Sequence, residues 1–230
     1  MQSMLGITGP LALAAALAGG GARAGMGESP WSQTVDLAGG VGSSRFTGAL
    51  SWNQFYGLFD QRLHVGLGAR LTSFFGSGAV PYTTADASLI SANTVNTLTV
   101  RDPQAHSLNA QFLIRFRAVA ALELGFDIDL VGFAFGPSRT GDYAATDPQF
   151  AGPQPASVSG FDLLLLGKRD RGQLDSEFFL AWWFTEKLAI RAGLSHFATG
   201  YTTDNNLDNG ADRFRVSQNL GFLALSWRLF

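Results

Sequence analysis

The chain has 230 residues, of which only 15% are Asp, Glu, Lys or Arg, and its formal net charge is −2. An average soluble domain carries roughly 25% charged residues, whereas this chain is 46% hydrophobic and has no cysteine. The composition excludes a basic nucleic-acid-binding surface, a disulfide framework, a Cys-ligated metal site and a disordered chain.

The first 24 residues are predicted to be a signal peptide. An apolar run (LALAAALA, residues 11–18) is followed by three glycines and by Ala22-Arg23-Ala24. This order is typical of the hydrophobic region and the A-x-A cleavage site of an exported protein. Residues 25–230 are then the mature chain, and an alanine-rich helix of the mature fold is the alternative.

Beyond residue 30, apolar and polar residues alternate with a period of two. Leu63, Val65 and Leu67, for example, alternate with His64 and Gly66, so the two sets lie on opposite faces of a strand. Eight segments are predicted to be strands, namely residues 31–42, 46–59, 62–75, 107–118, 121–135, 173–184, 187–200 and 213–230. Since no run of about 20 apolar residues occurs there, this part of the chain could cross lipid only as a closed barrel.

The connections between these strands alternate in length. Short turns are expected near residues 60–61, 119–120 and 185–186, and long outer loops over residues 76–106 and 136–172. This asymmetry is typical of outer-membrane barrels. The predicted fold is therefore all-β, an eight-stranded antiparallel up-and-down transmembrane β-barrel. Residues 158–169 are assigned to the second of these long loops, and a strand, a hairpin or a loop cap all remain open for them.

The pattern resembles the small eight-stranded outer-membrane barrels of the OmpA, OmpX and OmpW type. The resemblance covers residues 31–230 and includes the C-terminal Trp227-Arg228-Leu229-Phe230. It implies a bacterial outer-membrane location, contact with outer-membrane lipid, and recognition of Phe230 by the barrel-assembly machinery. Ser226 and Arg228 depart from the family, because those positions are commonly apolar there.

The charged residues fall mainly on the predicted inner face. An eight-stranded barrel is just wide enough to be filled by side chains, and an unpaired charge inside it would be costly. We therefore expect an ion-pair network of Asp36, Arg70, Arg115, Arg117, Glu123, Asp127, Asp129, Glu177, Arg191 and Arg228. Arg117 is expected to pair with Glu123, and Arg115 with Asp127. A closed interior is the preferred interpretation, and a narrow or gated pore is the alternative.

Residues that could carry catalysis do not form a motif. The segment Ser195-His196-Phe197-Ala198 invites comparison with outer-membrane lipid hydrolases, in which a His-x-Ser pair supplies the base and the nucleophile. Ala198 stands at the serine position, and a methyl group cannot attack an ester. Asp175-Ser176 resembles the Asp-Ser pair of palmitoyltransferase barrels only as a dipeptide. We predict no enzymatic role and no cofactor.

Residues 204–212 resemble the start of a calcium loop, since Asp204, Asn206, Asp208 and Asp212 offer oxygen ligands. Gly210 comes one place late and Arg215 stands where the closing Glu belongs. A solvated, turn-rich loop is therefore the default interpretation, and no metal site is predicted.

These features together predict a non-enzymatic outer-membrane barrel with a structural or adhesive role. Loops 76–106 and 136–172 would contact an extracellular or outer-membrane protein partner, and no nucleic acid is expected as a partner. One alternative is a narrow channel for small or hydrophobic solutes, as the resemblance to OmpW implies. Two others are an outer-leaflet lipid-modifying enzyme and a soluble β-sandwich.

Overall fold

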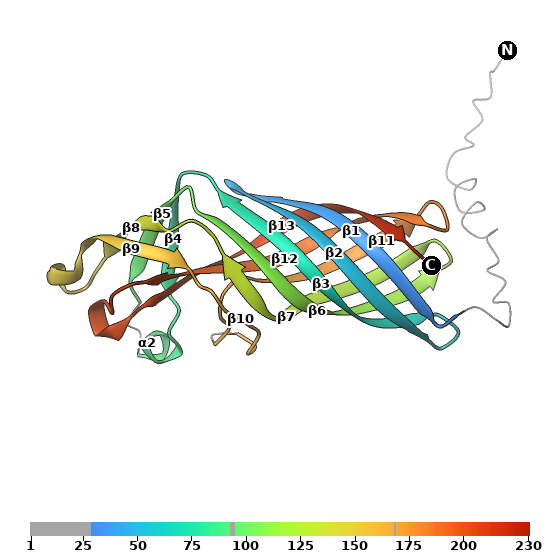
Figure 1. Ribbon diagram of the computed structural model, residues 1–230, viewed down its shortest axis with the longest axis horizontal. Helices are drawn as coiled ribbons and strands as arrows, with labels where there is room; N and C mark the ends of the chain where they lie inside the picture. Colours follow the sequence, from blue (N-terminus) through green and yellow to red (C-terminus); the bar gives the residue numbers. More distant parts are fainter. Residues whose placement is uncertain (1–28, 93–94, 168) are drawn as a thin grey trace, which may run out of the picture.

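The computed structural model describes residues 29–92, 95–167 and 169–230. These residues form thirteen strands, one short α-helix and two 3-10 helices (Figure 1). The strands are β1 (Trp31–Gly42), β2 (Arg45–Leu58), β3 (Leu63–Gly76), β4 (Ala79–Thr84), β5 (Thr97–Arg101), β6 (Gln104–Val119), β7 (Leu122–Phe135), β8 (Arg139–Ala144), β9 (Gly152–Val158), β10 (Asp162–Leu163), β11 (Leu174–Trp183), β12 (Leu188–Thr203) and β13 (Arg213–Arg228). The helices are α2 (Ala87–Ser91), η1 (Pro148–Phe150) and η2 (Asp208–Gly210). The predicted signal peptide, residues 1–24, lies outside the described residues.

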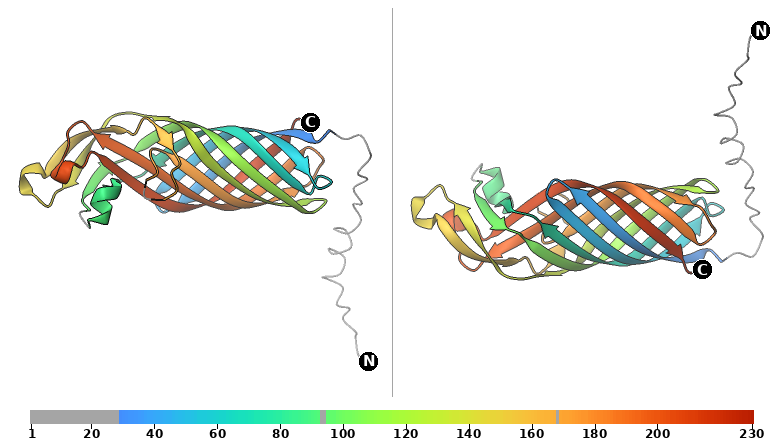
Figure 2. Two further views of the ribbon diagram at one scale, coloured as in Figure 1. Left: turned by 90° about the horizontal axis from the view of Figure 1, so that it is seen from below. Right: turned by 90° about the horizontal axis from the view of Figure 1, so that it is seen from above.

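Eight of the described strands close into one antiparallel ring, which we call the main ring. Its order is β1–β2–β3–β6–β7–β11–β12–β13, and β13 pairs back with β1. Figures 1 and 2 show these strands tilted around a common long axis. Each of the eight predicted strand ranges overlaps one strand of this ring. Because every strand is paired on both sides, the main ring has no open edge along its paired length.

The two predicted long loops contain strands of their own, so eight is too low as a count for the chain. β4, β5, β8 and β9 pair with one another and with the outer ends of β12 and β13, in the order β12–β9–β8–β5–β4–β13. Since β12 and β13 are themselves paired, these six segments form a second closed cycle, which we call the outer ring. The four added strands are five to seven residues long, too short to stand out in the sequence.

Residues 158–169 contribute a short wall segment and not a ninth strand of the main ring. β10 pairs with Gly132 and Val131 of β7, beyond the point at which the pairing of β7 with β11 ends. On the other side, the Ser159 amide donates to the Gly200 carbonyl of β12 at 3.0 Å. The segment therefore closes the seam between β7 and β12 above the start of β11.

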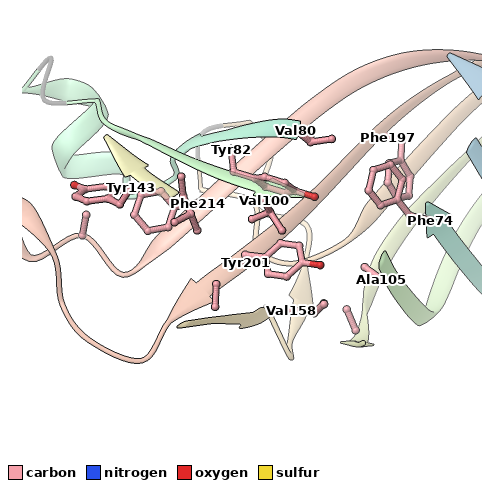
Figure 3. Close-up of a cluster of buried hydrophobic side chains, with 14 of the residues drawn as sticks. Phe74, Val80, Tyr82, Val100, Ala105, Tyr143, Val158, Phe197, Tyr201 and Phe214 are labelled. Carbon is pink, nitrogen blue, oxygen red and sulfur yellow. The ribbon is translucent and has the colours of Figure 1, made fainter. Parts of the chain in front are cut away.

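The interiors of the two rings differ in polarity: that of the outer ring is mainly apolar, and that of the main ring is mainly charged and polar. The outer ring contributes most of the largest cluster of buried hydrophobic residues, which includes Leu98. Figure 3 shows Tyr82, Tyr143, Tyr201 and Phe214 of this cluster. The main ring instead turns its apolar residues outward: Leu37, Leu67, Leu194 and Leu223 are 63–67% exposed. No helix within the described ranges is long and apolar enough to span a membrane.

Candidate functional site

The main candidate site is the charged interior of the main ring. Period-two alternation places one polar face of each strand inside, and the register brings residues from distant parts of the chain to one level. Eight of the ten predicted network residues are buried, namely Asp36, Arg70, Arg115, Glu123, Asp127, Asp129, Glu177 and Arg191. Arg117 and Arg228 are half-buried, toward the end at which the chain terminates.

Arg191 lies at the centre of this network. Its guanidinium donates to Asp36, to Asp127 at 2.7 Å and to Glu177 at 2.8 Å. It also lies over the aromatic face of Phe179, 3.7 Å from the ring centroid. A planar guanidinium can form all of these contacts at once because its donors point in fixed, divergent directions. Arg191 thereby connects strands β1, β7 and β11 from its place on β12.

Arg70 of β3 is surrounded by four carboxylates. Its guanidinium nitrogens lie 3.3–3.7 Å from oxygens of Asp127, Asp129, Asp175 and Glu177. These separations are longer than ordinary hydrogen bonds, so this cluster is held by charge attraction. Arg70 and Arg191 together neutralise much of the negative charge that β7 and β11 place in the interior.

The smaller pairs differ in part from the expected ones. Arg117 lies 3.5 Å from Glu123, as expected for neighbours across a short turn. The predicted pairing of Arg115 with Asp127 is wrong, because Arg115 reaches across the interior to Asp36 on β1, at 3.1 Å. Arg115 packs over the side chain of Phe55 on the way, 4.3 Å from its centroid. The ring of Phe55 therefore covers one face of the guanidinium that binds Asp36.

Sequence reasoning missed Asp175, a further buried acid of the β7–β11 region. Its carboxylate accepts a hydrogen bond from Ser195 and lies 3.3 Å from Arg70. The signal was available, since Asp175 precedes Glu177 by two residues and therefore shares its face. Buried amides were missed as well: Asn53 donates to Asp36 at 2.8 Å, and Asn109 donates to Asp129 at 3.0 Å.

Apolar layers fill the interior beyond the network. Phe74 of β3 and Phe197 of β12 stack with centroids 5.2 Å apart. Further out, Tyr82 and Tyr201 meet edge to face at 5.1 Å. Figure 3 shows these side chains pointing toward one another across the junction of the two rings. The outer end of the interior is therefore packed with side chains.

A row of polar side chains lies on the outside of the main ring. Ser176, His196 and Asn219 are register partners on β11, β12 and β13, and His196 Nδ1 lies 2.8 Å from Asn219 Oδ1. Ser176, His196 and Ala198 line a cavity of about 130 Å³. His196, the residue compared above with a catalytic base, thus has an amide partner in Asn219. Ser176 lies opposite His196 on the neighbouring strand.

The residues of the weak calcium-loop candidate are not gathered around a common point. The Asp208 carboxylate accepts hydrogen bonds from Asn96 and from the backbone amides of residues 146 and 147. Asp212 pairs with Arg213 at 3.6 Å, and Asp204 and Asn206 are exposed. Within the described part of the chain, no group of three or more His, Cys, Asp or Glu is placed to hold a metal ion.

Asp86 shows how the outer ring is fastened at its rim. Its carboxylate accepts hydrogen bonds from the Ser88 amide and hydroxyl, and pairs with Arg213 at 2.8 Å. The hydrogen bonds from Ser88, with help from Arg213, lower the pKa of Asp86 to about 2. The side chain thereby caps α2 and ties it to β13.

The C-terminal residue lies just beyond β13. The side chain of Phe230 is exposed, and its carbonyl accepts a hydrogen bond from the Gln33 amide of β1 at 3.2 Å. The end of the chain is therefore joined to the strand that closes the main ring.

No family model and no curated protein matches the chain. Among solved structures it is similar to Neisserial surface protein A, with 9% identity and a TM-score of 0.42 over 86% of this chain and 97% of that one. It is also similar to a major outer membrane protein from Thermus thermophilus, with 14% identity and a TM-score of 0.39 over 86% and 99%. The N-terminal β-barrel domain of Pseudomonas aeruginosa OprF gives 10% identity and a TM-score of 0.34 over 87% and 98%. At these identities the similarity does not indicate a shared ligand or activity.

Proposed function

We propose that this protein is an integral outer-membrane protein in which the main ring is an eight-stranded transmembrane β-barrel. The observation that carries the proposal is the inverted distribution of side chains. Leucines and aromatic residues cover the outside of the main ring, while arginines and carboxylates are buried inside it. A soluble sheet buries its apolar face, and an apolar surface of this extent is stable in contact with lipid.

Aromatic residues at both ends of the outer face support the same proposal. Trp31 and Tyr56 pack together at the end where the chain enters the ring, with centroids 4.9 Å apart. Phe46 and Phe75 stack at the opposite end, at 6.3 Å. Two such belts are expected where amphipathic rings meet lipid headgroups. The ring would be oriented with its short turns in the periplasm and the outer ring outside the cell.

The proposed role is structural or adhesive and involves no catalysis. The ion-pair network and the Phe74–Phe197 stack fill the interior, which favours a closed barrel over a channel. The outer ring would then be the surface that meets an extracellular or outer-membrane partner. In planar bilayers we expect no steady conductance from the intact protein. Steady single-channel currents would favour the alternative, a narrow pore for small or hydrophobic solutes.

Gel migration of the outer-membrane fraction tests the proposed architecture. A folded barrel is not unfolded by detergent without heating, so it migrates differently before and after boiling. It is also released from washed membranes only when detergent dissolves the lipid. The N-terminal sequence of the purified protein tests export, because cleavage after Ala24 would leave Gly25 first. Identical migration with and without boiling, or release by salt alone, would contradict the proposal.

A lipid-modifying enzyme remains the second candidate because of the row on β11–β13. His196 is held by Asn219, and Ser176 is its register partner on the other side. Such an enzyme needs a serine nucleophile within reach of a histidine base, and the register places the two residues opposite each other on neighbouring strands. Lipid turnover by the reconstituted protein that is lost in both Ser176→Ala and His196→Ala would establish this function. Equal turnover in vesicles with and without the protein would dismiss it.

A further inference from the structure

Residues 159–167 and 169–172, which together we call the strap, present apolar side chains beside arginines on the outside of the molecule. Leu166 is 79% exposed, and Phe161 and Leu165 are about half exposed. Figure 1 shows this part of the chain, around β10, projecting sideways from the wall of the main ring. The strap therefore offers an apolar tip at the level where the main ring gives way to the outer ring.

The strap is built to hold this tip in place. The Asp170 carboxylate accepts hydrogen bonds from the amides of Leu165 and Gly167, at 2.7 and 3.1 Å. The Arg215 guanidinium of β13 donates to the carbonyls of Gly167 and Asp170. Leu166 itself adopts a φ of 64°, a left-handed conformation that is unfavourable for leucine. Strained residues of this kind persist where the surrounding contacts impose them, often at binding sites.

Three arginines line a cavity at the base of the strap. They are Arg171, Arg213 and Arg215, and the cavity, of about 160 Å³, lies between the strap and the outer ends of β12 and β13. Asp170 lines it as well, but its carboxylate is occupied by the amides of Leu165 and Gly167. Arg213 is paired with Asp86, and Arg215 is bound to the strap. The exposed Arg171 guanidinium has no hydrogen-bond or ion-pair partner among the described residues. One cation of the cavity is thus available to an anionic ligand.

We propose that the strap and this cavity bind the phosphate headgroup of an anionic lipid in the outer leaflet. Leu165 and Leu166 would insert among the acyl chains, while Arg171, supported by Arg213 and Arg215, would bind the phosphate. A guanidinium matches the geometry of phosphate oxygens, and a basic group beside inserted apolar side chains is the usual arrangement at an anionic membrane surface. The inference rests on the proposed function, because it requires the main ring to span the membrane.

A lipid fits this site better than a soluble anion because the apolar tip continues the outer wall. β10 pairs with β7 beside Val131, which is itself exposed on the outer face of the main ring. A free phosphate would use the arginines and leave Leu165 and Leu166 in water. A phospholipid or a phosphorylated glycolipid would cover both parts of the surface.

A fluorophore at the tip tests the insertion. The chain has no cysteine, so Leu166→Cys labelled with NBD reports one position, and Gln149→Cys on the exposed η1 serves as the reference. In vesicles of phosphatidylcholine with phosphatidylglycerol, the label at 166 should be blue-shifted, quenched by nitroxide lipids and protected from iodide. The reference label should be open to iodide. Equal iodide quenching at the two positions, in protein whose heat-shifted migration shows a folded barrel, would refute the inference and leave the proposed function standing.

The lipid selectivity tests the role of the arginine. We expect spin-labelled phosphatidylglycerol to be retained by the protein over spin-labelled phosphatidylcholine, and Arg171→Ala to lower this preference about fivefold. Arg101→Ala removes an exposed arginine of β5 that does not line the cavity and should leave the preference unchanged. Equal losses in the two variants would contradict the proposed site. If millimolar inorganic phosphate abolished the preference, the site would be one for soluble anions, and the assignment to lipid would be wrong.

Discussion

Replacing Arg191 with alanine is the sharpest perturbation of the closed interior. Arg191 binds Asp36, Asp127 and Glu177 and packs over Phe179. Its removal leaves three buried carboxylates with one cation fewer, in an interior where solvation by water is limited. The variant also empties the space above the face of Phe179.

The expected loss of stability depends on which cations remain near the three carboxylates once Arg191 is removed. Removing one partner of a buried ion pair costs about 3–5 kcal/mol, and the lost cation–π contact adds to this. Arg70 stays near Asp127 and Glu177 at 3.7 and 3.6 Å, and Arg115 stays on Asp36 at 3.1 Å. We therefore expect the lower end of the range, a loss of about 3 kcal/mol in the free energy of unfolding.

Urea titration of the protein in vesicles, followed by tryptophan fluorescence, measures this loss. With a slope of about 2–3 kcal/mol per molar urea, the midpoint should fall by roughly 1–1.5 M. Arg213→Ala is the matched control, because Arg213 and its partner Asp86 are each about 30% exposed, and this pair should contribute about 1 kcal/mol or less. An Arg191→Ala protein that unfolds at the midpoint of the parent would refute the idea of an interior held together by ion pairs.

Three further changes test other parts of the structure. Gly125→Ala places a methyl group against the side chain of Phe179 and should lower the free energy of unfolding by about 1–3 kcal/mol in urea titrations. Gly48→Ala meets no atom within 4 Å and should be nearly neutral, so equal losses in the two variants would contradict the packing. Leu98→Ala should destabilise the outer ring by about 2–5 kcal/mol and speed its proteolysis while the heat-shifted migration of the main ring persists, and loss of both together would show that the rings fold as one unit. The pKa of Asp86, lowered from 3.8 to about 2 by its hydrogen bonds, stabilises the rim above pH 3.8, and this contribution is lost as the pH falls through 2; an NMR midpoint near 4 for this carboxyl would disagree.

The wall of the main ring follows from the sequence because its signal is long and regular. The strands of the main ring are 10–16 residues long. In most of them apolar and polar residues alternate, which leaves little freedom in which face is buried, whereas β11 is apolar on both faces and is assigned from its length and place in the chain. The same rule identifies the inward charges. It cannot say which charge meets which, because partners such as Arg115 and Asp36 are joined across the interior and not along neighbouring strands.

The strands of the outer ring were not predicted from the sequence, for a different reason. Val80 and Tyr82, or Leu98 and Val100, alternate over only five or six residues, and such runs also occur in loops. Their pairing becomes favourable only when β12 and β13 extend beyond the main ring and supply the two remaining strands. Tertiary context of this kind decides short strands more than local preference does.

The most direct test of the whole account is the accessibility of β3 in lipid vesicles. Single cysteines can be placed at successive positions from His64 to Leu71 in this cysteine-free chain, labelled with a nitroxide, and read for contact with oxygen dissolved in the bilayer. We predict high oxygen contact at Val65, Leu67 and Leu71, low contact at His64 and Arg70, and a period of two between them. Uniform accessibility along β3, or greater contact with lipid at Arg70 than at Leu71, would contradict a transmembrane barrel with a closed, charged interior.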